Sequence, residues 1–518
     1  MGCIVSSPNS KGIISVNPEK IKKRVIQPTN TDIRKNYEFI SMLGHGQFGK
    51  VRLYRDRNYK DLLFAIKTLK KEGIPPCQFD LLKSEVSILS DLDHPNIVKY
   101  FGTFEDDFYI HILMEYLKGH DLNKIISLKK YTGFDEKDMA KIIEQLLKAL
   151  SFIHSKKIIH RDIKPENILF SNKKDYSTLK LIDFGLATTK RNKEEVGTPL
   201  FMSPEATIGN SCPKSDIWSV GIIVYLMITG KYAFMVESND DNFQDLYKKI
   251  QTENYDIGPL VDSECSSEAI GFIKGCLTKN IFNRFDTQQC LYHPWIQKYS
   301  TKNESNTLKM DIKNILLDFE KKTTLQKEIY YFIAKVSRES DLVELKKFFQ
   351  ILDSKNNGIL SKEDIESGFK EMGIQISNKE LTIIWNGLDF HKDGKINYSE
   401  FLGAMISSSH FENDEKLLSV FNIFKESQKN KNYITYESMS KAAKALNLNI
   451  DEIELKKCFK KYDEELKFED FKKIILGDEE KEEKFDKEST KIGRINSVNT
   501  KKIGHNNNEF FKTKTYKK

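Results

Sequence analysis

Two groups of residues near the start of the chain have the types and spacing that phosphate chemistry requires. Residues 43–51 read LGHGQFGKV, and glycines at such positions let backbone N–H groups approach a polyphosphate closely. Lys67 ends a strand-like apolar segment, from which an ammonium group can reach the α and β phosphates of a nucleotide. Glu85, on a helical stretch at 81–90, is available as its ion-pair partner. Each signal alone also fits a hairpin turn or an edge charge, so other motifs must decide.

The decisive motifs follow in a fixed order. Residues 160–167 read HRDIKPEN, residues 183–185 read DFG and residues 203–205 read SPE. Over residues 37–296 this order and spacing resembles a protein kinase. The resemblance also implies that Arg284 pairs with the glutamate of the SPE motif as a structural bridge.

The resemblance implies a role for each polar residue of these motifs. Phosphoryl transfer depends on positioning and on charge neutralisation more than on covalent help. Asp162 is expected to orient the substrate hydroxyl and accept its proton, and Lys164 to neutralise the migrating phosphoryl group. Lys67 is expected to hold the α and β phosphates. Asn167 and Asp183 offer hard oxygen ligands to Mg²⁺.

The same resemblance implies an ATP site between the glycine-rich loop and the segment that connects the two lobes. Backbone groups of Glu115 and Leu117 are expected to bond adenine, which apolar side chains sandwich. Met114 is expected to close the pocket behind adenine, and Asp121 to meet the ribose. The residues expected to contact ATP are Leu43, Gly44, His45, Gly46, Gln47, Phe48, Gly49, Lys50, Val51, Ala65, Lys67, Glu85, Met114, Glu115, Leu117, Asp121 and Leu169.

Several residues of the same region bear on substrate choice. Lys164, two residues after Asp162, and Thr198, before the SPE motif, are typical of serine/threonine rather than tyrosine kinases. Glu166 lies where kinases that prefer basic substrates contact an arginine upstream of the target. We therefore expect protein substrates with basic residues near the target Ser or Thr.

Control of the activation segment has two interpretations. Thr188 and Thr189 are candidates for phosphorylation, or are ordinary loop residues. Glu194 and Glu195 lie near the usual phosphorylation site, where a carboxylate can take the place of a phosphate and pair with Arg161.

Residues 343–476 contain four helix–loop–helix units, each with an apolar residue at the eighth position of its loop. We expect these residues to pair two by two as short bridges between neighbouring loops. They are Leu360, Ile396, Ile434 and Leu466, at intervals of 36, 38 and 32 residues.

The loops resemble EF-hands, which bind Ca²⁺ through oxygen ligands at positions 1, 3, 5, 7, 9 and 12. In loop 389–400, position 3 holds His391, a poor ligand; the expected Ca²⁺ ligands are Asp389, Asp393, Lys395 (through its carbonyl), Asn397 and Glu400. Loop 353–364 is a weaker site because Lys355 occupies position 3; its candidates are Asp353, Asn357, Ile359, Ser361 and Asp364. The third loop carries lysines at ligand positions and the fourth is shortened, so neither is expected to bind Ca²⁺.

The whole plan, over residues 37–476, resembles the calcium-dependent protein kinases. This implies an α+β bilobal kinase fold followed by an all-α, calmodulin-like EF-hand domain. An amphipathic helix at 310–342 matches the junction that blocks the active site in that family until Ca²⁺ withdraws it; alternatively, it is a linker docked on the EF-hand region. The expected parts are a flexible lipidated leader (1–36), a catalytic domain (37–296), a linker with the junction helix (297–342), EF-hand pairs (343–408 and 409–476) and a disordered basic tail (477–518).

The N-terminal residues form a modification signal. The chain begins MGCIVS, which matches the myristoylation pattern at Gly2, and Cys3 can take a palmitoyl chain. Two acyl chains anchor a protein stably, whereas one is marginal. We therefore expect a cytoplasmic protein held peripherally on a membrane; the alternative is a disordered leader that begins with Gly-Cys by coincidence.

Composition excludes several classes of protein. Of 518 residues, 39% are hydrophobic and 30% charged, which is compatible with packed domains. The longest apolar run, at 220–229, is shorter than the roughly 20 residues of a membrane helix, so we expect a buried helix there. Seven scattered cysteines predict reduced thiols, and a net charge of +7 does not indicate nucleic-acid binding. We expect a monomer.

Three functional hypotheses follow. The leading one is a membrane-tethered serine/threonine kinase that uses ATP and Mg²⁺ and is regulated by Ca²⁺ through its EF-hand region. The second keeps the enzyme but makes that region a calcium-insensitive docking module. The third is a calcium-binding adaptor with an inactive kinase domain, which the presence of Lys67, Asp162 and Asp183 disfavours.

Overall fold

The computed structural model divides into two compact units, and most of the chain, including the catalytic domain, belongs to the first. Gly2, Cys3, Gln47 and Phe48 lie outside the described residues, as do the leader to residue 32 and the tail from residue 478. The structure describes residues 33–46, 49–57, 63–72, 76–129, 134–173, 176, 178–189, 194–236, 243–300, 311–337, 342–407, 414–425, 432–445 and 448–477.

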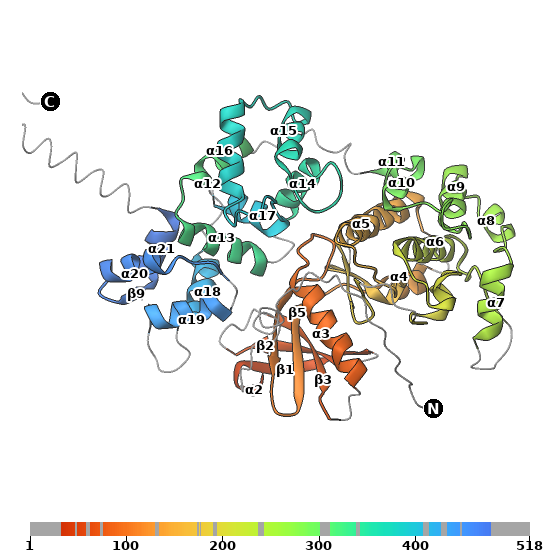
Figure 1. Ribbon diagram of the computed structural model, residues 1–518, viewed down its shortest axis with the longest axis horizontal. Helices are drawn as coiled ribbons and strands as arrows, with labels where there is room; N and C mark the ends of the chain where they lie inside the picture. Colours follow the sequence, from red (N-terminus) through yellow and green to blue (C-terminus); the bar gives the residue numbers. More distant parts are fainter. Residues whose placement is uncertain are drawn as a thin grey trace, which may run out of the picture. The chain divides into compact units, whose positions relative to one another are not determined.

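The first lobe of the catalytic domain is built on a five-stranded antiparallel sheet of order β1-β2-β3-β5-β4 (Figure 1). The inner strands β3 and β5 are the most apolar, and Ile66 and Ile112 on them are fully buried. The elements are α2 (Ile33–Asn36), β1 (Tyr37–Gly46), β2 (Gly49–Asp56), β3 (Leu63–Lys70), α3 (Pro76–Ser90), β4 (Tyr100–Glu105) and β5 (Tyr109–Glu115).

The second lobe is helical and packs around α5 and α6. Helix α6 is apolar on all sides, so it is buried on all sides, which confirms the expectation for residues 220–229. The elements are α4 (Leu122–Lys129), α5 (Glu136–Ser155), η1 (Pro165–Asn167), β6 (Ile168–Phe170), β7 (Leu179–Leu181), η2 (Pro199–Phe201), η3 (Ala206–Ile208), α6 (Pro213–Thr229), α7 (Gln244–Thr252), α8 (Gly258–Asp262), α9 (Ser267–Cys276), α10 (Thr287–Leu291) and α11 (Pro294–Tyr299).

The junction forms two helices rather than the single helix expected over 310–342. Helix α12 (Ile312–Glu320) and helix α13 (Thr324–Val336) are separated by a turn. The break has a local cause: Thr323 N–H donates to Gln326 Oε1 at 2.9 Å, and Gln326 N–H donates to Thr323 Oγ1 at 3.3 Å. This reciprocal capping box starts a new helix.

The first EF-hand pair lies in the same unit as the catalytic domain. Its helices are α14 (Val343–Leu352), α15 (Lys362–Glu371), α16 (Asn378–Leu388) and α17 (Tyr398–Ile406), gathered with α12 in Figure 1. Two mutual backbone hydrogen bonds join Leu360 and Ile396, as expected. Helix α12 lies against α16 so closely that a Cβ on Gly387 would be 2.9 Å from Glu320 Cβ.

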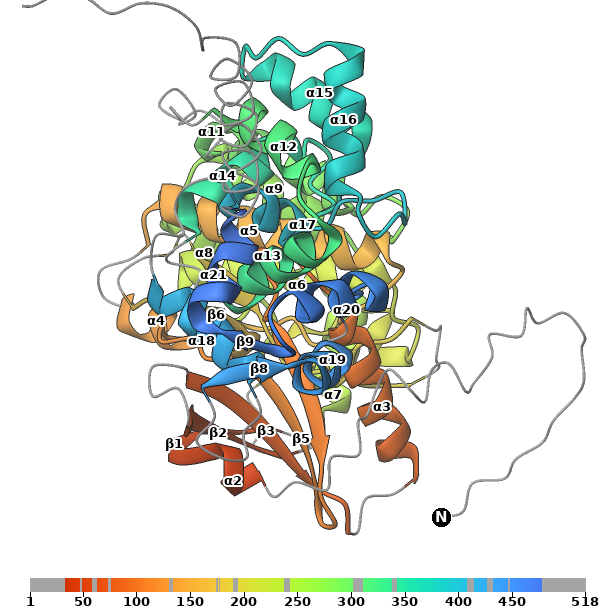
Figure 2. The same ribbon diagram turned by 90° about the vertical axis from the view of Figure 1, so that its left-hand side faces the viewer.

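The second EF-hand pair falls largely in the other unit. Strands β8 (Tyr433–Thr435) and β9 (Glu465–Lys467) pair side by side (Figure 2) and join Ile434 to Leu466, which confirms the predicted bridge. Its helices are α18 (Asp414–Phe424), α19 (Tyr436–Ala445), α20 (Glu452–Lys461) and α21 (Phe468–Leu476). Across the described ranges of the chain, no helix is both long enough and apolar enough to span a bilayer.

Candidate active site and calcium-binding region

A buried chain of charges joins the two lobes. Lys67 Nζ on β3 lies 2.6 Å from Glu85 Oε1 on α3 and 3.0 Å from Asp183 Oδ1. Burial opposes the charged amine, but Glu85 and Asp183 outweigh it and hold the pKa of Lys67 above its ordinary value. Likewise, burial raises but Lys67 lowers the pKa of Asp183, and the net shift is downward. The lysine is therefore a fixed positive charge, as phosphate binding requires.

The carboxylate of Asp162 is held by three neighbours. Thr198 Oγ1 donates to Asp162 Oδ1 at 2.7 Å. Lys164 Nζ lies 2.8 Å from Asp162 Oδ2 and also donates to Thr198 Oγ1 at 2.9 Å. Asn167 Nδ2 donates to Asp162 Oδ2 at 3.0 Å. These contacts fix the direction of a carboxylate that remains partly exposed.

The residues expected to hold Mg²⁺ fit that ion chemically. Asn167 uses its amide nitrogen for Asp162, which leaves the amide oxygen as a possible metal ligand. Asp183, two residues after the end of β7, has a side chain that is 32% exposed. Its φ of 59° is rare for a residue with a side chain, and such strain is commonly found at functional sites. Both groups are hard oxygen donors of the kind Mg²⁺ prefers.

Asp216 on α6 holds the backbone of the loop that carries Asp162. Its carboxylate accepts the backbone N–H groups of His160 and Arg161 at 3.0 Å each, and His154 Nε2 lies 2.7 Å from Asp216 Oδ2. Arg161 has a φ of 67°, and these hydrogen bonds help to hold that conformation. The sequence did not indicate this role for Asp216.

The activation segment contains a built-in ion pair. Arg161 NH1 lies 3.2 Å from Glu194 Oε2, and Arg161 Nε donates to the Leu186 carbonyl at 2.6 Å. This is one of the pairings that the sequence suggested. Thr188 is buried and exchanges two backbone hydrogen bonds with Ile159, which favours its interpretation as a structural residue.

The glycine-rich segment is a β1–β2 hairpin in which Gly44 pairs with Val51 and Gly46 with Gly49. His45, Lys50 and Leu43 belong to the same two strands. A Cβ on Gly49 would lie 2.4 Å from the Thr68 carbonyl oxygen, so only glycine fits there. This close contact with Thr68 packs the β2 end of the hairpin directly against β3.

The expected adenine-binding residues lie on β3, at the end of β5 and on β6. Ala65 and Met114 are directly opposite on the paired strands β3 and β5. Leu117 is buried, and Leu169 is bridged to Asp121. Asp121 Oδ1 accepts the N–H of Lys124 at 2.7 Å, so this carboxylate also caps the start of α4.

Glu115, at the end of β5, is held by partners that the sequence did not indicate. Its Oε1 lies 3.2 Å from the fully buried Lys180 Nζ and accepts the Lys99 N–H at 2.6 Å. These contacts hold the side chain of Glu115, whose backbone is expected to bond adenine.

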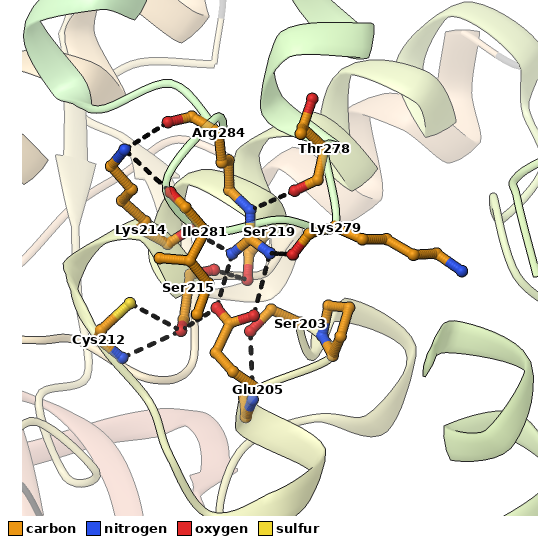
Figure 3. Close-up of polar contacts among 12 residues, drawn as sticks. Ser203, Glu205, Cys212, Lys214, Ser215, Ser219, Thr278, Lys279, Ile281 and Arg284 are labelled. Carbon is orange, nitrogen blue, oxygen red and sulfur yellow. Dashed lines mark hydrogen bonds and ion pairs between the residues drawn. The ribbon is translucent and has the colours of Figure 1, made fainter. Parts of the chain in front are cut away.

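A second buried ion pair stabilises the helical lobe. Arg284 NH1 and NH2 lie 2.6 and 3.0 Å from the two carboxylate oxygens of Glu205, and Ser215 Oγ donates to Glu205 Oε1 at 2.6 Å (Figure 3). Burial raises but Arg284 lowers the pKa of Glu205, and the net shift is downward. The expected structural bridge is therefore present.

Hydrogen bonds and an ion pair within the loop organise residues 353–364. Asp353 accepts the N–H groups of Asn357 at 3.0 Å and Gly358 at 2.8 Å, and burial raises its pKa to about 6. Lys355 Nζ lies 3.2 Å from Asp364 Oδ1. Ser361 forms a capping box with Asp364. Lys355 stands at position 3, where an EF-hand needs an oxygen ligand, and this agrees with the weak calcium-binding signal of the sequence.

Loop 389–400 keeps most of an EF-hand donor set. Asp389 accepts N–H groups from Asp393 at 3.0 Å and Gly394 at 3.2 Å. Asn397 caps α17 together with Glu400. His391 at position 3 contacts Glu400 through Nδ1 and the carboxylate. Within the described ranges, no three His, Cys, Asp or Glu side chains converge as a metal-binding group.

Comparison with known proteins gives the family. Residues 37–296 match the protein kinase domain and residues 342–406 match the EF-hand domain pair. Calcium-dependent protein kinase 4 of Plasmodium falciparum (isolate 3D7) is 32% identical over 440 residues, 80% of this chain and 82% of that protein. Calcium-dependent protein kinase 14 of Arabidopsis thaliana is 30% identical over 459 residues, 85% of this chain and 84% of that protein. The chain belongs to the calcium-dependent protein kinase family.

Proposed function

We propose that this protein transfers the γ-phosphate of ATP to serine and threonine hydroxyls of other proteins, under the control of calcium. The observation that carries the proposal is the fixed carboxylate of Asp162, held by Thr198, Lys164 and Asn167. A carboxylate held in this way can orient an alcohol and accept its proton as the phosphoryl group arrives.

Each residue has a separate task in the proposed reaction. Lys67, kept charged by Glu85 and Asp183, binds the α and β phosphates. Asn167 and Asp183 would hold Mg²⁺, which would supply positive charge to the phosphate oxygens. Lys164, beside Asp162, neutralises charge that develops on the transferred group. The expected products are ADP and a phosphoprotein.

We propose that substrates carry basic residues near the target hydroxyl. Glu166 is exposed in η1, four residues after Asp162. A carboxylate at this distance along the chain from the catalytic group can pair with an arginine of the substrate. Peptides with and without that arginine distinguish this preference.

Calcium regulation is proposed to act through loop 389–400. Asp389, Asp393, Asn397, Glu400 and the Lys395 carbonyl supply oxygen ligands once His391 moves away from Glu400. In the proposed resting state, the junction helix α12 covers the active site. The apolar side chains Ile312, Leu316 and Phe319 of α12 are buried, and α12 lies against α16.

We further propose that the protein is a monomer on the cytoplasmic side of a membrane, held there by acyl chains on Gly2 and Cys3. Support comes from the matching N-terminal pattern, to which nearby lysines add attraction for anionic lipid.

The decisive experiment measures transfer of radioactive phosphate from ATP to a basic serine peptide by the full chain, in chelator and in micromolar Ca²⁺. We expect transfer to require Lys67 and to rise with Ca²⁺. K67M is the inactive control, and a peptide with tyrosine in place of serine is the specificity control. No labelling by the wild-type chain under either condition would refute the proposed enzyme.

A further inference from the structure

The first EF-hand loop carries a lysine at ligand position 3, and this lysine pairs with the carboxylate at position 12. Lys355 Nζ lies 3.2 and 3.4 Å from the two carboxylate oxygens of Asp364, at position 12 of the loop. Asp353, at position 1, accepts the N–H groups of Asn357 and Gly358, as Asp389 does from Asp393 and Gly394 in the second loop, so Lys355 is what distinguishes the first loop. An ammonium group within the ligand shell repels a divalent cation, so the residues at this loop do not fit calcium.

The same loop is seated on the catalytic domain. A Cβ on Gly358 would lie 2.6 Å from His94 Cδ2 and 2.7 Å from Phe152 Cδ2. The rings of His94 and Phe152 are stacked, with centroids 5.1 Å apart, and both are buried. Ile359 packs against the core of the catalytic domain. Position 358 therefore admits no side chain while the loop is docked.

A second anchor lies at the start of α17. Ser399 donates its backbone N–H and its hydroxyl to the two oxygens of Asp93, at 2.9 Å each. Ser399 is the second residue of α17, so its N–H has no carbonyl partner within the helix. Asp93 and His94 both belong to the connection between α3, which carries Glu85, and β4.

The turn at Gly394 in the second loop is not seated in this way, although Ser399, at position 11 of the same loop, is anchored to Asp93. Gly394 is the counterpart of Gly358 and has a similar φ, +76° against +69°, but a Cβ there would meet nothing within 4 Å. A cavity of about 210 Å³ separates Asp393 and Lys395 from catalytic-domain residues such as Lys156. Gly394 therefore faces open space, whereas Gly358 lies against the rings of the catalytic domain.

We propose that loop 353–364 is a docking loop that needs no calcium. The Lys355 ammonium group takes the place of the metal ion and keeps the loop in the shape that seats Gly358 on His94 and Phe152. The first EF-hand pair is thus attached to the connection between α3 and β4 whether or not calcium is present. This goes beyond the proposed function, because calcium bound at loop 389–400 would then act on a pair that is already docked.

Hydrogen exchange of the full chain in chelator, without ATP, tests the proposal. The Ser399 amide reports docking because its partner is Asp93, and in the wild type we expect it to be protected. G358A should accelerate its exchange roughly tenfold, because the added methyl group collides with the two rings. G373A, just after α15 and outside both loops, imposes similar backbone strain in open space (φ +71°) and should leave the Ser399 amide unchanged. Equal acceleration by both variants would show that backbone strain, not contact, is responsible.

Two substitutions at Lys355 test the role of its charge. K355M removes the cation and should accelerate Ser399 exchange in chelator and in Ca²⁺ alike. K355D supplies the missing position-3 carboxylate, so it should accelerate exchange in chelator and restore protection in millimolar Ca²⁺. Protection of the wild type that appears only with Ca²⁺, or K355M behaving as the wild type, would overturn the proposal. Exchange within α5 controls for folding, and the kinase assay remains a separate test of the proposed function.

Discussion

At the scale of single residues, the active site is organised by fixing carboxylates. Thr198 holds one oxygen of Asp162, while Lys164 and Asn167 hold the other. Preorganised groups of this kind stabilise a transition state without having to move during the reaction. The threonine is a partner that the sequence analysis used only to distinguish serine/threonine from tyrosine kinases.

Replacing Asp162 should separate catalysis from nucleotide binding. D162N keeps the size of the side chain but removes the proton acceptor, so we expect phosphate transfer to fall by roughly 10²–10⁴-fold. Affinity for ATP, measured by fluorescence titration, should change little because Lys67 and the glycine-rich hairpin are unaltered. A variant with near wild-type turnover would show that Asp162 is not the base.

The Glu205–Arg284 pair should make stability depend on pH. The folded-state pKa of Glu205 lies below its ordinary value, so the unfolded chain binds a proton more readily. The pair therefore contributes full stability above the ordinary glutamate pKa and loses it as the pH falls through the lower, folded value. E205Q leaves Arg284 buried without a charged partner and should cost about 3–5 kcal/mol at pH 7. Denaturant unfolding of both proteins, followed from pH 7 to below the folded-state pKa of Glu205, should show the difference shrinking only in the acid part of this range; a difference that stays constant through that pKa would contradict this.

At the scale of elements, the EF-hand loops differ because their position-3 and position-12 residues differ. Loop 389–400 keeps Glu400, which can provide two oxygens to Ca²⁺, whereas loop 353–364 ends in the shorter Asp364 paired with Lys355. Calcium sensitivity should therefore be concentrated in one loop.

Replacing Glu400 should blunt the calcium response. E400Q removes one negative charge from the ligand set, so we expect the Ca²⁺ concentration for half-maximal kinase activity to rise by about tenfold or more. S438A, at the corresponding position of the third loop, is the matched control and should leave this concentration unchanged. Identical calcium curves for E400Q and the wild type would exclude loop 389–400 as the sensor.

The junction shows why helix boundaries were harder to predict than helices. The apolar residues of α12 and α13 keep a helical spacing across the turn, so the pattern suggested one helix over 310–342. The signal for the break was present in Thr323 and Gln326, which form the capping box. Such a short signal is easily missed within a long amphipathic pattern.

At the scale of the whole molecule, the sequence predicted the chemistry of the sites better than the contacts between domains. Phosphate transfer restricts residue types at Lys67, Asp162 and Asp183, so these positions are recognisable without a structure. The contact of Gly358 with His94 and Phe152 cannot be recognised in the sequence, because the turn of an EF-hand loop already requires a glycine at that position. The ion pair between Glu115 and Lys180 could not be predicted either, because residues that are far apart in the sequence and meet in the fold follow no spacing rule.

Acylation should determine where the molecule resides. G2A removes the myristoylation site, so we expect the protein to move from the membrane fraction to the soluble fraction of cells. C3S retains myristate alone and should bind membranes reversibly and weakly. Fractionation with labelled myristate measures both; incorporation into G2A equal to that into the wild type would refute the assignment.

The contact between Arg161 and Glu194 has a consequence for signalling. Because this glutamate is encoded rather than added, its negative charge is available from the moment the chain folds. No upstream enzyme has to install it, and no phosphatase can erase it. The negative charge beside Arg161 therefore does not depend on the activity of a second kinase or of a phosphatase. The speed and duration of a response that relies on this charge do not depend on those enzymes either.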